Sequence, residues 1–143
     1  MKFINSTCAQ LNRFYKENKD KARAKPDDLM FAAIDENQQV CAVLRLLPYA
    51  QFYFLRSVLT SPESRGEGIA STLIQYAIDS QFGQAENTPI YTLPTPLALP
   101  LYSRLGFTAI EQADIPVELQ SSYRRFRHAN NDSSVMVIRP AVG

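Results

Sequence analysis

A glycine-bearing turn between an apolar run and a helical pattern is the feature that most limits how this chain can fold. The stretch runs from Leu55 to Ile74, and it contains Gly66 and Gly68, two of the five glycines in the chain. The helical pattern that follows has no glycine or proline before Gly83. Glycine allows backbone conformations and close approaches that a side chain would block. The sequence therefore predicts a strand, a tight turn and a helix, with the turn backbone close to a ligand.

The rest of the chain alternates between helical and strand patterns around this unit. Helical spacing of apolar residues predicts helices over Cys8–Ala24, after the turn to about Gln81, within Thr95–Leu105 and from Pro116 to about Arg127. Short apolar runs predict strands over Leu29–Ile34, Val40–Leu47, Phe52–Thr60, Pro89–Leu93, Phe107–Ile110 and Val135–Arg139. We expect one α/β (α+β) domain over residues 1–143, with a mixed, largely antiparallel central sheet of about six strands and helices on both faces. Parallel pairing is expected where the long helix crosses over.

Composition and charge exclude several classes of function. Fifteen Lys and Arg against fourteen Asp and Glu give a net charge of +1, which argues against a nucleic-acid partner. The apolar runs are too short to span a bilayer, so we expect no membrane partner. Cys8 and Cys41 are isolated and the chain has one histidine, so no metal site is expected. The first residues lack the pattern of a secretory signal, which predicts a cytoplasmic location.

The glycine turn has the chemistry of a diphosphate site. A strand that passes through such a turn into a helix leaves several N–H groups unpaired, where the helix dipole also favours negative charge. Arg65 adds a charge-assisted donor. A P-loop is excluded because Gly68 is followed by Ile69 and not by lysine. A dinucleotide-binding fingerprint fits poorly, because the strand before the turn is the third in an antiparallel series. A turn that only starts a helix, without binding a ligand, is the remaining alternative.

Two sequence motifs carry a family resemblance. The run Arg-Gly-Glu-Gly-Ile-Ala from Arg65 to Ala70 resembles the acetyl-CoA signature Gln/Arg-x-x-Gly-x-Gly/Ala of the GNAT N-acetyltransferase superfamily. Leu-Tyr-Ser-Arg-Leu-Gly-Phe, from Leu101 to Phe107, is similar to the second signature of that family. The order of elements resembles the family from residue 1 to 139, although the first strand and one of the two early helices look short or absent.

The resemblance implies acetyl-CoA as co-substrate, with no metal, and assigns its binding residues. The family's diphosphate site corresponds to Arg65, Gly66, Gly68, Ile69, Ala70 and Ser71. The family's pantetheine arm lies along the preceding strand, which here corresponds to Val58, Leu59 and Thr60. A bulge is expected in that strand, where it would splay the strand from its neighbour at Pro89 and open a slot for the cofactor.

The resemblance also implies a catalytic acid. Tyr102 matches the family tyrosine that protonates the departing thiolate, and a phenol with a pKa near 10 stays protonated until the sulfur takes its proton. A core aromatic at a helix end is the alternative role for Tyr102. A backbone N–H near Leu59 is the family-like donor to the oxyanion. The general base stays unassigned, because the strand has no acidic residue between Gln51 and Ser61.

The expected function is direct transfer of an acetyl group from acetyl-CoA to a primary amine of a small molecule or peptide. The alternative is a non-catalytic acyl-CoA-binding module, which would keep the glycine turn without needing Tyr102. The identity of the acceptor stays open, because acceptor pockets come from variable loops and often from a second subunit. The length of the acyl chain and a possible homodimer also stay open. Arg124, Arg125 and Arg127 either complement the dipole of a predicted helix or hold an acidic group of the substrate.

Overall fold

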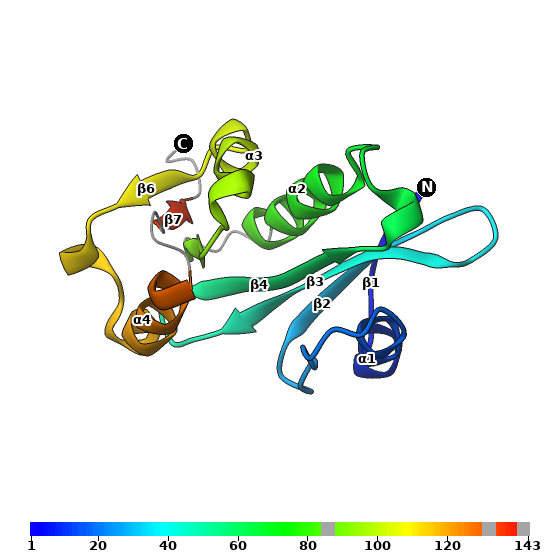
Figure 1. Cartoon of the computed structure of the whole chain (residues 1–143), viewed down its shortest axis with the longest axis horizontal. Helices are drawn as coiled ribbons and strands as arrows, with labels where there is room; N and C mark the ends of the chain where they lie inside the picture. Colours follow the sequence, from blue (N-terminus) through cyan, green and yellow to red (C-terminus); the bar gives the residue numbers. More distant parts are fainter. Residues whose placement is uncertain (84–87, 130–133, 140–143) are drawn as a thin grey trace.

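The computed structural model describes residues 1–83, 88–129 and 134–139, which form a layered α+β fold (Figure 1). Its strands are β1 (Lys2–Asn5), β2 (Leu29–Ile34), β3 (Val40–Pro48), β4 (Tyr53–Thr60), β5 (Ile90–Thr92), β6 (Thr108–Ile110) and β7 (Val135–Ile138). Within the described ranges these strands form one sheet in the order β1-β2-β3-β4-β5-β7-β6. Every pairing is antiparallel except that of β4 with β5. The predicted mixed, largely antiparallel sheet is confirmed.

Helices cover both faces of the sheet. They are α1 (Cys8–Glu17), α2 (Ile69–Phe82), α3 (Leu99–Arg104) and α4 (Gln120–Ala129), with short 3-10 turns η1 (Pro62–Ser64), η2 (Pro96–Ala98), η3 (Gln112–Asp114) and η4 (Val117–Leu119). In Figure 1, α2 and α3 lie above the sheet and α1 and α4 lie below it. The helix α2 connects β4 to β5, and such a crossover gives parallel pairing.

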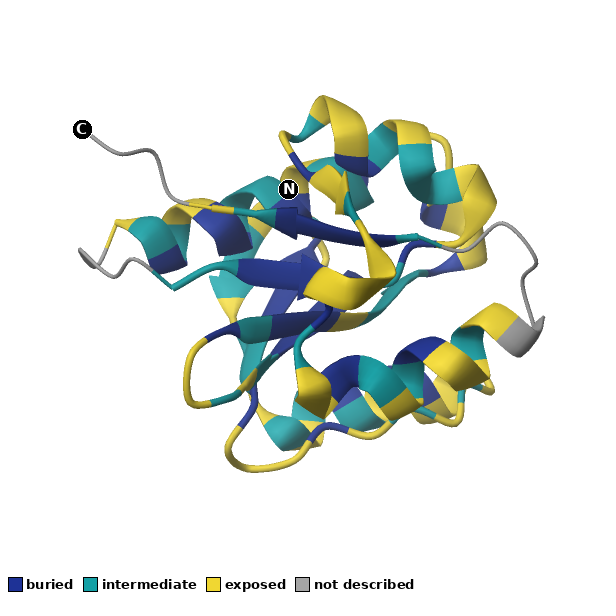
Figure 2. Ribbon diagram, turned by 90° about the vertical axis from the view of Figure 1, so that its left-hand side faces the viewer, coloured by how far each residue is buried: buried dark blue, intermediate teal, exposed yellow. Residues whose placement is uncertain are grey.

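The strand β4 lies at the centre of the sheet, and Phe54 and Leu55 near its start are buried on opposite faces. Successive side chains of a strand point to opposite faces. Leu55 accordingly packs in the apolar cluster under α2, while Phe54 packs with Leu119 and Tyr123 on the side of α4. Figure 2 shows buried strands between helices whose outer surfaces are exposed. The continuous apolar run that begins β4 thus reflects the central place of this strand in the sheet.

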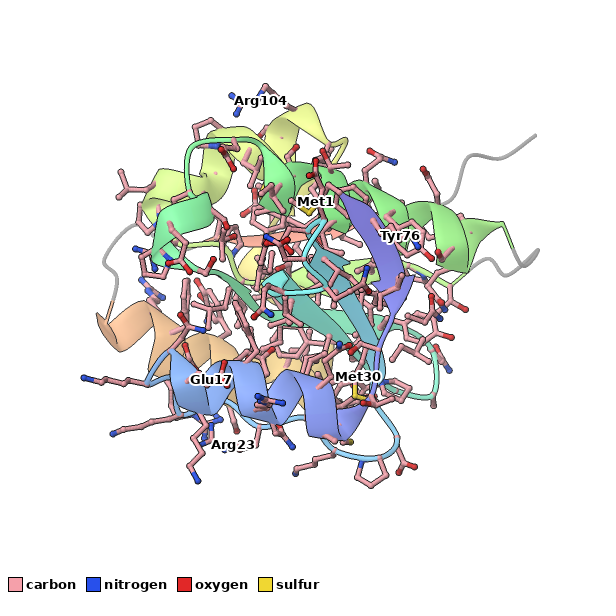
Figure 3. All side chains as sticks on the ribbon, turned by 90° about the vertical axis from the view of Figure 1, so that its right-hand side faces the viewer. Met1, Glu17, Arg23, Met30, Tyr76 and Arg104 are labelled. Carbon is pink, nitrogen blue, oxygen red and sulfur yellow. The ribbon has the colours of Figure 1, made fainter. Side chains whose placement is uncertain are left out.

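The first strand is present but has only four residues, which agrees with the indication from the sequence that it was short or absent. The strand β1 pairs along β2, from Lys2 opposite Ile34 to Asn5 opposite Phe31. Figure 3 shows Tyr76 of α2 beside this strand, where its hydroxyl donates to Asn5 Oδ1 at 3.3 Å. This edge strand therefore depends on contacts with distant segments, which a local pattern does not reveal.

The first helix is shorter than predicted. It ends at Glu17 and not at Ala24, because Asn18 caps it and Lys19 adopts a φ of 57°, which breaks the helix. The Asn18 side chain donates to the carbonyl of Phe14 at 2.8 Å. The charged segment after Glu17 is therefore a connection to β2. The helix predicted within Thr95–Leu105 begins only at Leu99, after the 3-10 turn η2, and Pro100 lies in its first turn.

Candidate active site

A β-bulge interrupts the pairing of β4 with β3. The register shifts between Val43 and Arg45, so that Ser57 and Val58 together lie opposite Leu44. Ser57 has a φ of 57°, a left-handed conformation that is uncommon outside glycine. A bulge of this kind bends the strand and increases its twist. The bulge expected in this strand is confirmed.

A cleft opens where β4 and β5 separate. Their parallel pairing ends at Leu55 and Thr92, and the Thr92 hydroxyl donates to the Leu55 carbonyl at 3.2 Å. Beyond this point lies a cavity of about 730 Å³. Its walls come from β4, from the segment after β5, from α3 and from α4. The predicted slot beside the bulged strand is therefore present.

The cleft brings together residues that the sequence placed in one site. The predicted residues that line it are Val58, Leu59, Thr60, Arg65, Ala70 and Tyr102. The other predicted residues belong to the turn and the first turn of α2 without lining the cavity, and they are Gly66, Gly68, Ile69 and Ser71. The two signatures thus meet across one cavity although they are far apart in the sequence.

The glycine turn leaves open space at the start of α2. Gly66 and Gly68 have φ values of 82° and 74°, and a Cβ built at either residue would have no atom within 4 Å. Gly68 is the N-cap of α2 and provides no side-chain cap, which leaves the first amides of the helix available to another acceptor. Arg65 Nε donates to the Thr60 carbonyl at 3.3 Å and links the end of β4 to the turn.

Tyr102 lies in α3 at the inner wall of the cleft. Its ring is 6% exposed and packs edge-on against Phe107, with ring centroids 5.3 Å apart. Burial raises the pKa of the Tyr102 phenol, and a hydrogen bond with the Thr92 side chain partly offsets this. The phenol is therefore protonated across the physiological pH range. Tyr102 is a core aromatic and also lines the cleft, so its two predicted roles are compatible.

The arginine cluster of α4 divides between the cleft and the outer surface. All three arginines are exposed, but only Arg125 lines the cleft. Arg127 reaches Gln112 Oε1 at 3.5 Å. Arg56 of β4 also lines the cleft. Sequence reasoning missed Arg56 because Arg125, which lines the same cleft, lies on a helix far away in the sequence. Other cleft residues that it missed are Thr92, Ser122 and Phe126.

Comparison with known families decides the class of the protein. The model of the acetyltransferase (GNAT) domain matches residues 26–109, which is more than half of the chain. This chain belongs to the GNAT acetyltransferase family. It is therefore an acyltransferase of a family that depends on acetyl-CoA and acetylates amine acceptors. The predicted family and enzyme class are confirmed.

Solved structures share the GNAT fold over nearly the whole chain. The ribosomal-protein-S18-alanine N-acetyltransferase from Escherichia coli is 13% identical, with a TM-score of 0.73 over 99% of this chain and 96% of that one. A chimera of the Vibrio cholerae spermidine N-acetyltransferase SpeG and hSSAT is 19% identical, with a TM-score of 0.69 over 97% and 96%. N-acetylglutamate synthase from Neisseria gonorrhoeae, complexed with coenzyme A and N-acetyl-glutamate, is 15% identical, with a TM-score of 0.70 over 99% of this chain and 36% of that one. No curated protein sequence matches this chain.

No helix in the described residues is both long and apolar enough to cross a bilayer. In the same ranges, no three His, Cys, Asp or Glu side chains come together as a metal site would need.

A buried polar network holds the bulge of the GNAT cleft from the α1 side. Tyr15 Oη of α1 donates to the Ser57 carbonyl at 2.7 Å, and Arg45 Nη2 donates to Ser57 Oγ at 3.2 Å. Arg45 Nη1 also donates to Asp28 Oδ2 at 3.0 Å, in a salt bridge whose side chains are 8% and 5% exposed. The bulge residue is thus fixed through both its backbone and its side chain. Arg45 is the only charge in the run Val40–Leu47, a signal that could have revealed this network.

The stability of the GNAT domain should depend on Tyr15 at alkaline pH. Burial raises the pKa of Tyr15 to about 12, although the Arg45 guanidinium opposes the shift. Above about pH 10 the unfolded chain loses this proton first, so the stabilisation is complete below about pH 10 and is lost as the pH approaches about 12. We expect Tyr15→Phe to be less stable at neutral pH but to lose less stability on alkaline titration. Urea unfolding of both proteins at several pH values tests this, and parallel pH profiles would contradict it.

Proposed function

We propose that this chain transfers the acetyl group of acetyl-CoA directly to a primary amine of a small molecule or peptide. The observation that carries the proposal is one cleft that joins the bulged strand, the end of the glycine turn and Tyr102. In this proposal the diphosphate lies on the amides of the turn, with Arg65, Gly66, Gly68, Ile69, Ala70 and Ser71 around it. The pantetheine arm lies along Val58, Leu59 and Thr60.

The separation of β4 from β5 supports this placement of the cofactor. Pairing with β5 ends at Leu55, so on that edge of β4 the backbone groups of the following residues face the cleft, while the other edge stays paired with β3. The amide groups of pantetheine can pair with such a strand edge as an added strand would. The bulge then aims a backbone N–H near Leu59 at the thioester carbonyl, where it would stabilise the oxyanion.

The proposed reaction needs one acid. The neutral amine attacks the carbonyl carbon of the thioester, so that a C–N bond forms and the carbonyl oxygen becomes an oxyanion. Collapse of this intermediate breaks the C–S bond, and the Tyr102 phenol gives its proton to the departing sulfur. The nitrogen of the intermediate loses its extra proton to solvent, which leaves a neutral amide, and the Tyr102 phenolate takes a proton back from solvent. Among the described residues that line the cleft there is no carboxylate or histidine, so the amine must lose its proton to solvent or arrive neutral.

A screen of amines with acetyl-CoA tests this function. Release of free thiol shows that the thioester is consumed, and mass spectrometry of the same mixture shows whether the amine gained an acetyl group. The proposal expects both signals, in equal amounts, with some amines of the panel. Tight binding of acetyl-CoA without thiol release on any amine would instead support a non-catalytic acyl-CoA-binding module.

The diphosphate assignment predicts that Gly68→Ala weakens acetyl-CoA binding by about tenfold or more. The new Cβ would occupy the open space beside the turn. An alanine held at the φ of 74° of residue 68 would also add a strain of about 1–2 kcal/mol. Calorimetric titration with acetyl-CoA gives the dissociation constant. Gly106→Ala is the control for backbone strain, because Gly106 also has a positive φ, of 103°, but follows α3 outside the glycine turn; its new Cβ would meet Ile138 Cδ1 at 3.4 Å, so its own stability is measured as well. Equal dissociation constants for wild type and Gly68→Ala would argue against this placement.

A further inference from the structure

Two arginine side chains converge in the cleft from elements far apart in the sequence. Arg56 of β4 and Arg125 of α4 both line the cavity. Burial lowers the pKa of Arg56, and the positive charges of Arg45 and Arg125 lower it further. Both side chains are exposed to solvent, and together they add positive charge to one cleft.

This positive charge is not neutralised by the protein in the part of the chain that the structure describes. The salt bridges there are Arg45 with Asp28 and Arg13 with Glu17, and neither includes Arg56 or Arg125. Arg45 lies directly opposite Arg56 across β3 and β4, a pairing of like charges that destabilises a sheet. Arg56 lies instead over the ring of Phe54, with its Cζ 5.7 Å from the ring centroid. Two arginines that line one cleft without a carboxylate partner indicate a site for an anion.

The arginines lie at the end of the cleft opposite to the glycine turn. Figure 1 shows α4 beside the start of β4, whereas the end of β4 leads through η1 toward the start of α2. Arg56 comes just before the bulge, and Val58 to Thr60 come after it. A cofactor that runs from the turn along Val58 to Thr60 therefore presents its thioester toward the arginines. The group that they hold belongs to the acceptor and not to the diphosphate.

We propose that the acceptor carries an anionic group, a carboxylate or a phosphate, which Arg56 and Arg125 bind while its amine reaches the thioester. This inference rests on the proposed acetyl transfer and names the class of its acceptor. A guanidinium binds either anion through paired hydrogen bonds. The same two charges repel a polyamine, so amino acids and amino-phosphate compounds fit this cleft better than di- or polyamines.

Matched pairs of amines test the acceptor class. The panel holds L-amino acids with their amides, phosphoethanolamine with ethanolamine, and putrescine as a dication. We expect at least one anionic member to exceed its neutral partner in kcat/KM by about tenfold or more, with putrescine the poorest. The amino-acid and phosphoethanolamine arms distinguish a carboxylate from a phosphate. Neutral or cationic amines that react as well as every anionic member would overturn the proposal.

Variants locate the anion site. Arg125→Gln and Arg56→Gln should each raise KM for the preferred anionic acceptor by about 10- to 100-fold, with little change for its neutral partner or in acetyl-CoA binding. Arg124→Gln is the control, because Arg124 is exposed on the same helix and does not line the cleft. Equal losses with anionic and neutral acceptors, or an equal loss in Arg124→Gln, would overturn the assignment.

A binding measurement separates this inference from the proposed function. N-acetylated amino acids and N-acetylphosphoethanolamine are titrated into protein saturated with coenzyme A. Binding by the wild type that is lost in the Arg56→Gln/Arg125→Gln variant supports the anion site even if no amine is acetylated. Such binding without acetylation of any amine would refute the proposed acetyl transfer and still support the anion site. No binding of any anionic member, or equal binding by both proteins, would refute the site.

Discussion

Replacement of Tyr102 by phenylalanine is expected to lower kcat for acetyl transfer by about 10²- to 10⁴-fold. The variant loses the hydroxyl that gives its proton to the departing sulfur, while the ring and its packing on Phe107 remain. Acetyl-CoA should therefore bind about as well as it does to the wild type. Thiol release under saturating acetyl-CoA gives kcat, and calorimetry gives the dissociation constant.

The control for this variant is its folding stability. Tyr102 is buried in the core under α2, so a loss of activity counts only if the variant unfolds at nearly the same urea concentration as the wild type. A folded Tyr102→Phe protein with unchanged kcat would show that Tyr102 is a core aromatic alone. Another group would then have to protonate the sulfur.

Replacement of Arg45 by methionine is expected to destabilise the protein by about 3–5 kcal/mol. Arg45 and Asp28 form a salt bridge whose side chains are 8% and 5% exposed, so the variant leaves the Asp28 carboxylate buried without its cation. Urea unfolding gives the difference in the free energy of unfolding. Arg13→Met is the matched control, since its pair with Glu17 is 81% and 60% exposed and should contribute less than about 1 kcal/mol.

A second variant separates the charge of Arg45 from its role at the bulge. Asp28→Leu/Arg45→Met removes both charges, and apolar replacement of a buried ion pair is often neutral or stabilising. We expect most of the stability to return. Acetyl-CoA affinity should be below that of the wild type in both Arg45→Met and the double variant, because Ser57 lacks the hydrogen bond from Arg45 in each. Full recovery of acetyl-CoA affinity in the double variant would show that the bulge does not need this network. For Arg45→Met alone, a fall in the free energy of unfolding of less than about 1 kcal/mol would contradict the burial argument.

Local sequence patterns predicted the unit that carries the cofactor signature. The turn at Gly66 and Gly68 could be found because positive φ values favour glycine, and both residues have them. The helix after this turn follows an apolar period that local spacing reveals. The bulge near Ser57 was expected only through the family resemblance, because its residues have no glycine to mark it.

The features that the sequence missed depend on residues far apart in the chain. The strand Lys2–Asn5 is short and forms by pairing with β2, and no periodicity in four residues could identify it. Arg56 and Arg125 line the same cleft only because α4 packs against the sheet beside β4. In the sequence, Arg125 was one of several cations on a helix and Arg56 carried no signal. In the proposed anion site these two residues select the acceptor, and no local sequence pattern links them, so the acceptor could not be predicted from the sequence.

A crystal structure with bound coenzyme A tests the central claim most directly. The proposal predicts the diphosphate on the amides that follow Gly66 and Gly68, and pantetheine between β4 and β5. It also predicts the sulfur within hydrogen-bonding distance of the Tyr102 hydroxyl. A complex in which pantetheine lies outside this gap, or in which the sulfur lies far from Tyr102, would contradict the assignment of this cleft.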